Sequence, residues 1–230
     1  MKSLVVIPAR GGSKRVPGKN IKLLNQIPLI HYSIKAAQSV FSNECIHVST
    51  DSNDIKNIAE QTGIVIPKLR PNYLAIDTAT SRDVILHEMD EFKTANNGVE
   101  ADVVILLQPT SPFRNATHIK EALAQYNSSL DMVVSVKETD ANPYYLLFED
   151  NDDNYLENSK RRNFSKREDC PKVWELNGAI YVINPKSLRN SPIGDFNKVV
   201  KYVMDKEVSI DIDTPLDWEY AEFLIKKNIL

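Results

Sequence analysis

The chain has 230 residues, 42% of them hydrophobic and 26% charged, so it can bury a core of its own and a wholly disordered chain is excluded. Its 28 basic and 31 acidic residues leave a net charge of −3, which gives no general reason to expect nucleic acid or an anionic membrane as partner. No apolar run reaches the roughly 18 residues that span a bilayer, and the two cysteines form no Cys-x-x-Cys pair. We therefore expect a soluble, cytoplasmic protein.

Short apolar runs alternate with helical patterns over the first half of the chain. Residues 4–7 are an unbroken apolar run, and in the segment 102–107 five apolar residues follow Asp102; such runs are typical of strands buried on both faces of a parallel sheet. Further strands are expected at residues 45–48, 64–66 and 132–136, and helices at 28–40, 51–62, 81–93 and 117–126. This alternation predicts an α/β fold with a doubly wound, mostly parallel sheet and right-handed crossovers.

The alternation stops after residue 136. Residues 138–170 contain an aromatic stretch, an acidic turn and a basic cluster, which do not continue the sheet pattern. We interpret this segment as an inserted arm, because exposed aromatic side chains suit a dimer contact. A strand at 174–183 and a terminal helix at 215–226 follow. The sequence thus predicts one domain over residues 1–230 that carries a small dimerisation insertion at about 138–170.

A glycine-rich, cationic loop follows the first predicted strand. Only seven glycines occur in the chain, yet Gly11, Gly12 and Gly18 fall within eight positions and are interleaved with basic residues. Glycine permits close backbone approach, amides bind oxyanions and cations neutralise phosphate, at the strand end where α/β proteins bind ligands. The dinucleotide fingerprint is absent, and Lys19 is followed by Asn20 where a Walker loop needs Ser or Thr. We predict a polyphosphate site of another type; a solvated basic turn is the alternative.

Two aspartates alternate with isoleucines in Ser209–Thr214. If this segment is a strand, its period of two places Asp211 and Asp213 on one face, about 7 Å apart along the chain. Hard carboxylate oxygens suit a Mg²⁺ ion that bridges substrate phosphates. The spacing alone fits equally well an edge strand with a solvated face, followed by Asp213 or Thr214 as the cap of the terminal helix. Together with a polyphosphate loop, the magnesium interpretation gains weight.

The segment Gln108–Arg114 follows the second buried strand and contains two prolines. Proline fixes the backbone, so a rigid loop is predicted at the edge of the sheet where ligands bind. A purely structural turn into the next helix is the alternative. The four histidines show no ligand spacing, so none of them is predicted to be catalytic.

Four segments together resemble one known family. The segments Ile7–Asn20, Leu107–Arg114, Asn177–Tyr181 and Ser209–Thr214 are similar, in order and over nearly the whole chain, to the acylneuraminate cytidylyltransferases. The resemblance implies the nucleotide-diphospho-sugar transferase fold and a homodimer. It also implies that N-acetylneuraminate or a related 2-keto sugar acid is activated with CTP and Mg²⁺, giving a CMP-sugar and pyrophosphate.

Carried over by position, the resemblance implies roles for single residues. The nucleotide is expected to contact Arg10, Gly11, Gly12, Ser13, Lys14, Lys19, Asn20, Arg70 and Ser81. The sugar acid is expected at Gln108, Arg167 and Tyr181, and the metal at Asp211 and Asp213. Of these, Arg10, Lys19 and Asp211 are the predicted catalytic residues. The two cations would stabilise the leaving pyrophosphate, and we hypothesise that Asp211 takes the hydroxyl proton through the shell of the metal.

The chain departs from the family pattern at two places that concern the sugar. Asn142–Pro143 is followed by two tyrosines where the family often has a basic residue, and an aromatic pair of some family pockets is reduced to Phe196. Pseudaminic, legionaminic and deaminated neuraminic acid and the eight-carbon Kdo therefore stay open as substrates. A dinucleotide-dependent dehydrogenase is disfavoured by the missing glycine fingerprint. A non-catalytic nucleotide-binding protein is disfavoured because both the cationic loop and the acidic pair are present.

Overall fold

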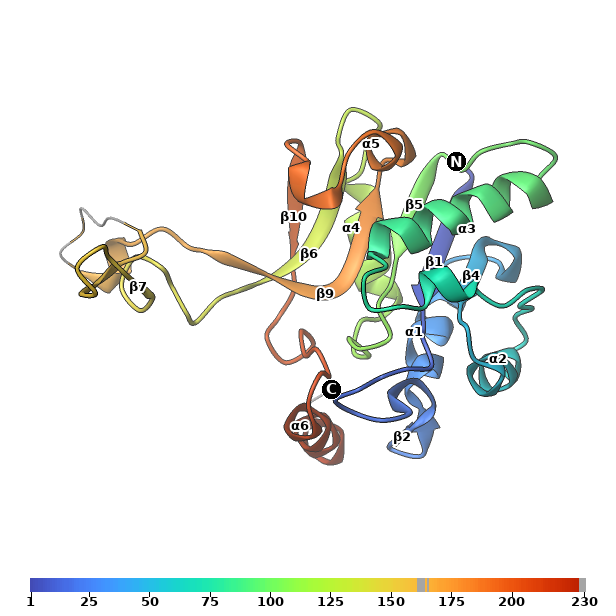
Figure 1. The fold of residues 1–230 in the computed structure, drawn as a ribbon, viewed down its shortest axis with the longest axis horizontal. Coiled ribbons are helices and arrows are strands. Elements are labelled where there is room, and N and C mark those ends of the chain that lie inside the picture. Colours follow the sequence, from blue (N-terminus) through green and yellow to red (C-terminus); the bar gives the residue numbers. More distant parts are fainter. Residues whose placement is uncertain (161–163, 165, 228–230) are drawn as a thin grey trace.

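A six-stranded sheet in the order β10-β6-β9-β5-β1-β4 forms the centre of the molecule (Figure 1). The computed structural model describes residues 1–160, 164 and 166–227. The strands are β1 (Ser3–Pro8), β4 (Ile46–Ser49), β5 (Val103–Leu106), β6 (Met132–Glu138), β9 (Trp174–Ile183) and β10 (Val199–Val203). Strand β9 runs antiparallel to β5 and β6, and the other neighbouring strands are parallel. The prediction of an α/β fold with a mostly parallel sheet is confirmed.

Helices cover both faces of this sheet. They are α1 (Leu29–Gln38), α2 (Asn53–Glu60), α3 (Ser81–Ala95), α4 (Ala116–Ala124), α5 (Pro185–Asn190) and α6 (Pro215–Lys226). Helices α1, α2 and α4 share one hydrophobic core, whereas α3 and α5 belong to the core on the opposite face. Strand β1 supplies both cores, because Val5 and Ile7 point to one face and Leu4 and Val6 to the other. None of these four side chains is accessible to solvent. The apolar run is therefore a central strand.

The last helix packs beside the glycine-rich loop instead of on the sheet. Trp218 and Leu224 of α6 share a third core with Val16 of the loop and with Leu24. Leu24 belongs to a hairpin of two short strands, β2 (Leu23–Leu24) and β3 (Ile27–Pro28). Among the residues that the structure describes, no helix is long and apolar enough to cross a membrane.

Two predicted strands are wrong. Residues 64–66 form no ladder, because the Ile66 amide donates to the Glu60 carboxylate (3.0 Å) while Ile64 and Ile66 pack into the core. Residues 209–214 also run as an extended loop, with Ile210 and Ile212 buried in the third core. The inward isoleucines produce the alternation of a strand, but no strand in the described part of the chain pairs with this segment. Strand β10 and helix α5, in contrast, are elements that the sequence analysis did not predict.

The inserted segment projects far from the sheet (Figure 1). It ends in an antiparallel hairpin of β7 (Phe148–Asp150) and β8 (Leu156–Asn158). Tyr155 and Leu156, at 71% and 70% exposure, are uncovered apolar side chains near its tip. Residues 161–163 and 165 of the predicted arm lie outside the described residues. The arm is present as a distinct projection, and its role in dimerisation stays a prediction.

Candidate functional site

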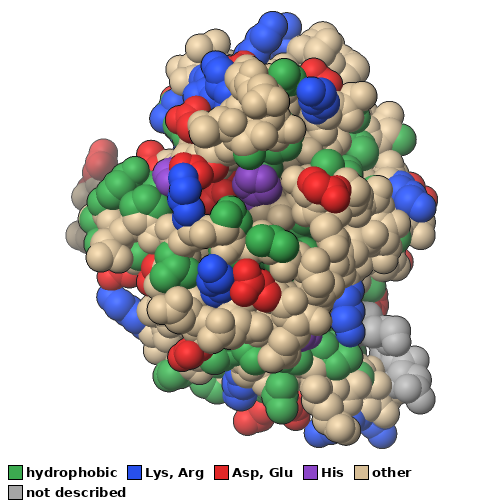
Figure 2. All heavy atoms as spheres, turned by 90° about the vertical axis from the view of Figure 1, so that its right-hand side faces the viewer, with side chains coloured by type: hydrophobic (Ala, Val, Ile, Leu, Met, Phe, Trp, Pro, Cys, Tyr) green, Lys and Arg blue, Asp and Glu red, His purple; other side chains and the backbone are tan. Residues whose placement is uncertain are grey.

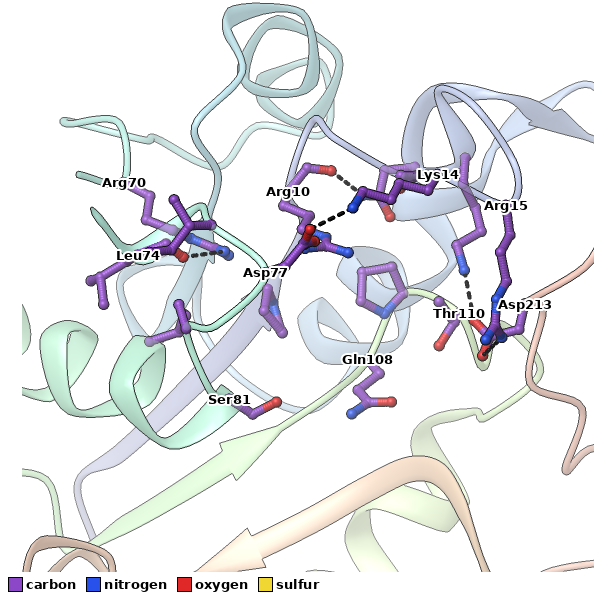
Figure 3. Close-up of a pocket in the computed structure, with 18 of the residues that line it drawn as sticks. Arg10, Lys14, Arg15, Arg70, Leu74, Asp77, Ser81, Gln108, Thr110 and Asp213 are labelled. Atoms are coloured by element: carbon purple, nitrogen blue, oxygen red, sulfur yellow. Dashed lines mark hydrogen bonds and ion pairs between the residues drawn. The ribbon is translucent and has the colours of Figure 1, made fainter. Parts of the chain in front are cut away.

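A cavity of about 580 Å³ opens at the carboxyl ends of β1 and β5 (Figure 3). It lies at the edge of the sheet where doubly wound folds bind their ligands. Most residues predicted to bind nucleotide line it, namely Arg10, Ser13, Lys14, Lys19, Asn20, Arg70 and Ser81. Gln108 and Asp213 also contribute to its wall, so four separated segments of the sequence meet here.

The glycine-rich loop is held in shape by its own polar contacts. The Asn20 side-chain amide donates to the Arg10 carbonyl (3.0 Å), and the Gly11 amide donates to the Asp51 carboxylate (2.8 Å). A side chain at Gly11 would begin 3.1 Å from Cβ of Ser52, so glycine is needed for this close approach. Gly12 has no comparable neighbour. The loop therefore presents its cations from a defined backbone.

Lys19 connects the loop to the aspartate segment. Its side chain is buried, and Nζ donates to the carbonyl oxygen of Ile212 (2.6 Å) and to Oδ1 of Asp213 (3.0 Å). Arg15 lies 3.5 Å from the other carboxylate oxygen of Asp213. The predicted phosphate loop and the predicted metal residues, almost 200 positions apart in sequence, thus form one charged cluster.

Asp77 was not predicted as a site residue, yet it contacts two cations of the loop. Its carboxylate accepts from Arg10 Nη1 (2.9 Å) and from Lys14 Nζ (2.5 Å), as Figure 3 shows. These hydrogen bonds, that of Lys14 first, lower the pKa of Asp77. Asp77 therefore stays ionised at neutral pH. It also lines the cavity.

Arg70 forms part of the cavity wall but uses its donors on the protein itself. Nε donates to the Ser49 hydroxyl (3.0 Å), Nη2 to the Ser49 carbonyl (2.5 Å) and Nη1 to the Leu74 carbonyl (3.5 Å). Burial lowers the pKa of its guanidinium, with the charges of Asp51 and Glu88 acting in the opposite direction. Arg70 therefore shapes the wall of the cavity at a place where the resemblance implies a contact with the nucleotide.

A second cavity of about 520 Å³ lies beyond Arg70, between β4, the loop of residues 63–71 and α3. Its lining includes the buried Glu88, which accepts from the His47 ring at 3.1 Å. Figure 2 shows this side of the molecule, where basic, acidic and histidine side chains are interspersed without one sign prevailing. Apart from Arg70, none of the predicted site residues lines it.

Gly178 marks the point where the predicted sugar and metal residues converge. Its φ of +72° favours glycine, and a Cβ there would lie 2.9 Å from Oε1 of Gln108 and 3.7 Å from Oδ2 of Asp211. Tyr181 follows on the same strand, β9, and burial and the charge of Asp211 both raise its pKa. Gln108, Tyr181 and Asp211 therefore share one region beside the cavity, although Tyr181 and Asp211 do not line the cavity itself.

The two aspartates differ in their surroundings. Desolvation raises the pKa of Asp211, and the charge of Asp213 adds to this, while a hydrogen bond with Thr110 and the charge of Lys19 lower it. Asp213 is paired with Lys19 and Arg15. A desolvated carboxylate with a raised pKa is stabilised by a nearby cation, so this pair of oxygen donors fits a hard ion such as Mg²⁺. No group of three His, Cys, Asp or Glu side chains suited to a metal exists in the described part of the chain, so water and substrate would supply the remaining ligands.

Arg114 lies beneath the site and was not predicted to belong to it. It is 3% exposed, and it donates to the Ala179 carbonyl (2.7 Å), the Ser33 hydroxyl (2.8 Å) and the Gln108 carbonyl. Burial lowers its pKa to about 9, with the charge of Asp211 acting in the opposite direction, so the side chain remains cationic at neutral pH. The single arginine of the Gln108–Arg114 motif therefore fixes that loop to β9.

A buried amide connects β9 to the aspartate segment. Asn177 accepts from the Ser135 hydroxyl (2.6 Å) and donates to the Ser209 hydroxyl (2.9 Å). Its backbone carbonyl accepts from the Ser111 hydroxyl (3.0 Å). Three of the four family-like motifs are thus joined by hydrogen bonds under the cavity. An asparagine before a glycine, directly ahead of the apolar run of residues 179–183, is the sequence signal that points to such a role.

Arg167 is the predicted site residue that lies neither at the cavity nor in the region beside it that holds Tyr181 and Asp211. It begins a short 3₁₀ helix in the arm, Arg167–Asp169, and its guanidinium lies 5.0 Å from the ring centre of Tyr145. The arm extends away from the strand ends that form the cavity (Figure 1). Within one chain, Arg167 is therefore separated from Gln108 and Tyr181, its predicted partners at the sugar.

Comparisons with known proteins agree with these motifs. The model of a family described as Cytidylyltransferase matches residues 4–230. The CMP-N,N'-diacetyllegionaminic acid synthase of Legionella pneumophila is 38% identical over 231 residues, which cover 99% of this chain and 98% of that protein. The N-acylneuraminate cytidylyltransferase of Escherichia coli is 34% identical over 99% of this chain, but the match covers 53% of that longer protein.

A solved structure supports the fold independently. The CMP:2-keto-3-deoxy-manno-octonic acid synthetase complexed with CTP superimposes with a TM-score of 0.72 and covers 99% of this chain and 100% of that one. The two sequences are 19% identical, so this similarity concerns the fold alone. It agrees with the mostly parallel sheet described above.

Proposed function

Because the chain belongs to the cytidylyltransferase family over residues 4–230, we propose that it activates a 2-keto sugar acid with CTP, giving a CMP-sugar and pyrophosphate. The observation that carries the proposal is the contact of Lys19 with Asp213, which joins a cationic loop to an acidic pair beside one cavity. Relatives named for legionaminic and neuraminic acids favour a nine-carbon substrate. The proposal keeps the cytoplasmic location that the sequence analysis expects.

In this reaction the cationic loop binds the triphosphate. Arg10, Lys14 and Lys19 provide charge-assisted donors for phosphate oxygens, and they are held by a backbone shaped through Asn20. Their charge also stabilises the pyrophosphate as it leaves, and little reorganisation is needed because the loop is already in place. The loop thus serves binding and leaving-group departure alike.

The chemical step is a direct substitution at phosphorus. The 2-hydroxyl oxygen of the sugar acid forms a bond to the α-phosphorus of CTP, the α–β phosphoanhydride bond breaks, and pyrophosphate leaves. Asp211 is the proposed acceptor of the hydroxyl proton, and its raised pKa favours that role. Mg²⁺ held by Asp211 and Asp213 would neutralise phosphate charge. Gln108 and Tyr181 orient the sugar acid beside Asp211.

We further propose that the protein is a homodimer in which the arm reaches the partner's site. Arg167 is a proposed contact of the sugar acid, but its arm carries it away from the cavity of its own chain. The uncovered Tyr155 and Leu156 supply an apolar surface for the contact. A twofold dimer makes such an exchange reciprocal, so each site would be completed by the other chain.

The overall proposal is tested by pyrophosphate release. The protein is mixed with CTP, Mg²⁺ and, separately, neuraminic, legionaminic, pseudaminic and deaminated neuraminic acids and Kdo. We expect release with at least one of the nine-carbon acids and none with ATP or GTP in place of CTP. Absence of release with every acid would refute the proposed reaction, and release with Kdo alone would refute the proposed substrate size.

Replacing Lys19 by Ala should weaken the interaction of the enzyme with the triphosphate of CTP. A charge-assisted hydrogen bond contributes about 1.5–3 kcal/mol, so kcat/KM for CTP should fall by roughly that energy. Steady-state kinetics with varied CTP measures it, and Lys172→Ala is the control, because Lys172 is an exposed lysine that pairs with Glu138. Near-normal kinetics for the Lys19 variant would mean that the loop does not hold the triphosphate.

Replacing Arg167 by Ala should raise KM for the sugar acid far more than KM for CTP, because this cation is assigned to the sugar carboxylate. Equal increases in both constants would contradict the assignment.

Mixing Arg167→Ala chains with Lys19→Ala chains tests the exchange of arms. If Arg167 acts on the partner, each mixed dimer contains one intact site and regains activity above either parent. If it acts within its own chain, mixing restores nothing.

A further inference from the structure

The cations of the glycine-rich loop are divided between two carboxylates of the chain. Lys19 and Arg15 pair with Asp213, whereas Arg10 and Lys14 pair with Asp77. Asp213 has a second task in the proposed reaction, as a metal ligand. No other cation contacts Asp77 within the described residues, so its carboxylate serves Arg10 and Lys14 alone.

We propose that Asp77 competes with the phosphates of the nucleotide for Arg10 and Lys14, and thereby sets the affinity for CTP and promotes the release of pyrophosphate. This inference rests on the proposed function. A carboxylate and a phosphate oxygen are both acceptors for the same guanidinium and ammonium donors. Phosphate groups that approach Arg10 and Lys14 from the cavity must therefore replace Asp77 at these donors.

Asp77 lies where phosphate can displace it from Arg10 and Lys14. Its side chain is 56% exposed, and exposed ion pairs are weak because water and salt screen them. A triphosphate carries several charges against the single charge of Asp77, so it wins the competition. Pyrophosphate is also multiply charged, but once its bond to CMP is broken it is held by its own contacts only, and Asp77 can take back the two cations.

The backbone around Asp77 can also move without loss of the helix that follows. Helix α3 has its own cap, since the Thr80 side chain accepts from the Asp83 amide and the Asp83 carboxylate accepts from the Thr80 amide. Before it, the segment from Ile76 to Ala79 contains one turn bond, from the Ala79 amide to the Ile76 carbonyl (3.1 Å). A shift of Asp77 therefore does not require α3 to unwind.

Calorimetric titration of Asp77→Asn tests the proposal directly. Loss of two exposed ion pairs should tighten the binding of CTP and of pyrophosphate by about two- to tenfold. Cytidine, which carries no phosphate, should bind as it does to the wild type. The matched control is Glu100→Gln, which removes one acidic charge from an exposed ion pair with Lys93 away from the cavity and should change none of these affinities.

Turnover supplies a second readout. Inhibition by pyrophosphate should strengthen in Asp77→Asn by the same factor as its binding, and Asp77→Ala should behave alike. Weaker or unchanged binding of CTP to both variants would overturn the proposal, because Asp77 would then be orienting the cations or doing nothing to them. A wild-type protein that binds no CTP at all would instead refute the proposed function, so the two failures are distinguishable.

Discussion

Replacing Asp211 by Asn should reduce turnover by about 100-fold or more, which corresponds to about 2.7 kcal/mol of barrier, while the protein still folds. The substitution keeps the shape of the side chain and removes one of two charges that face the proposed metal. Asp211 has a raised pKa because desolvation disfavours its charged form, so loss of that charge should not destabilise the fold. Turnover against Mg²⁺ concentration, with a melting curve for each variant, measures both effects.

Asp213→Asn should reduce turnover similarly, but it also deprives Lys19 and Arg15 of their shared partner. Part of the loss in either variant should be recovered at higher Mg²⁺ if the defect lies in metal affinity. Glu219→Gln, on the exposed surface of α6, controls for the loss of an acidic charge nearby. Thr214, not Asp213, caps α6, so helix capping offers no other explanation. A fully active, slightly less stable Asp211→Asn protein would refute the assignment of Asp211 as a metal ligand.

Replacing Arg114 by Met should destabilise the fold by about 3 kcal/mol or more, because three oxygen acceptors, two of them in buried contacts, lose a charged donor. For a chain of this size, that energy corresponds to a fall of roughly 6–12 °C in melting temperature. The matched control is Arg82→Met, since Arg82 also donates to two carbonyls, at 2.8 Å each, but in a less buried place. Water can replace the donors lost there, so the control should change little.

The Arg114 variant should also lose activity in the protein that remains folded. The Gln108 carbonyl would lose a donor and the region around Asp211 a buried positive charge. Measuring turnover below the melting transition, against folded protein, separates this effect from instability. A variant with unchanged melting temperature would show that the motif arginine does not hold the loop to β9.

Local sequence was sufficient to predict the central strands and the glycine-rich loop. A strand buried on both faces has no position for a polar residue, so Leu4–Ile7 and the run before Gln108 stand out from any neighbouring pattern. Glycines and cations directly after such a strand indicate a phosphate site because both requirements are local. The meeting of the glycine-rich loop and Gln108 at the cavity then follows from the parallel arrangement of β1 and β5.

Tertiary structure decided the features that depend on distant partners. The direction of β9 between β5 and β6 depends on the path of the long arm, which no periodicity encodes. The alternation in Ser209–Thr214 correctly predicts buried isoleucines and outward aspartates, but a strand also needs a neighbour, and here Ile212 donates only to the Thr110 carbonyl (2.7 Å). A side-chain pattern reports burial, whereas a ladder is a property of two segments.

Asp77 and Arg114 illustrate the same limit at the site. Asp77 meets Arg10 across 67 positions of sequence, and Arg114 meets Ala179 across 65. Each residue looks ordinary in its own segment, one in a polar loop and the other at the end of a proline-rich motif. Their importance comes from charge and hydrogen bonding, which act through space over a few ångströms, so it exists only once folding has brought the partners together.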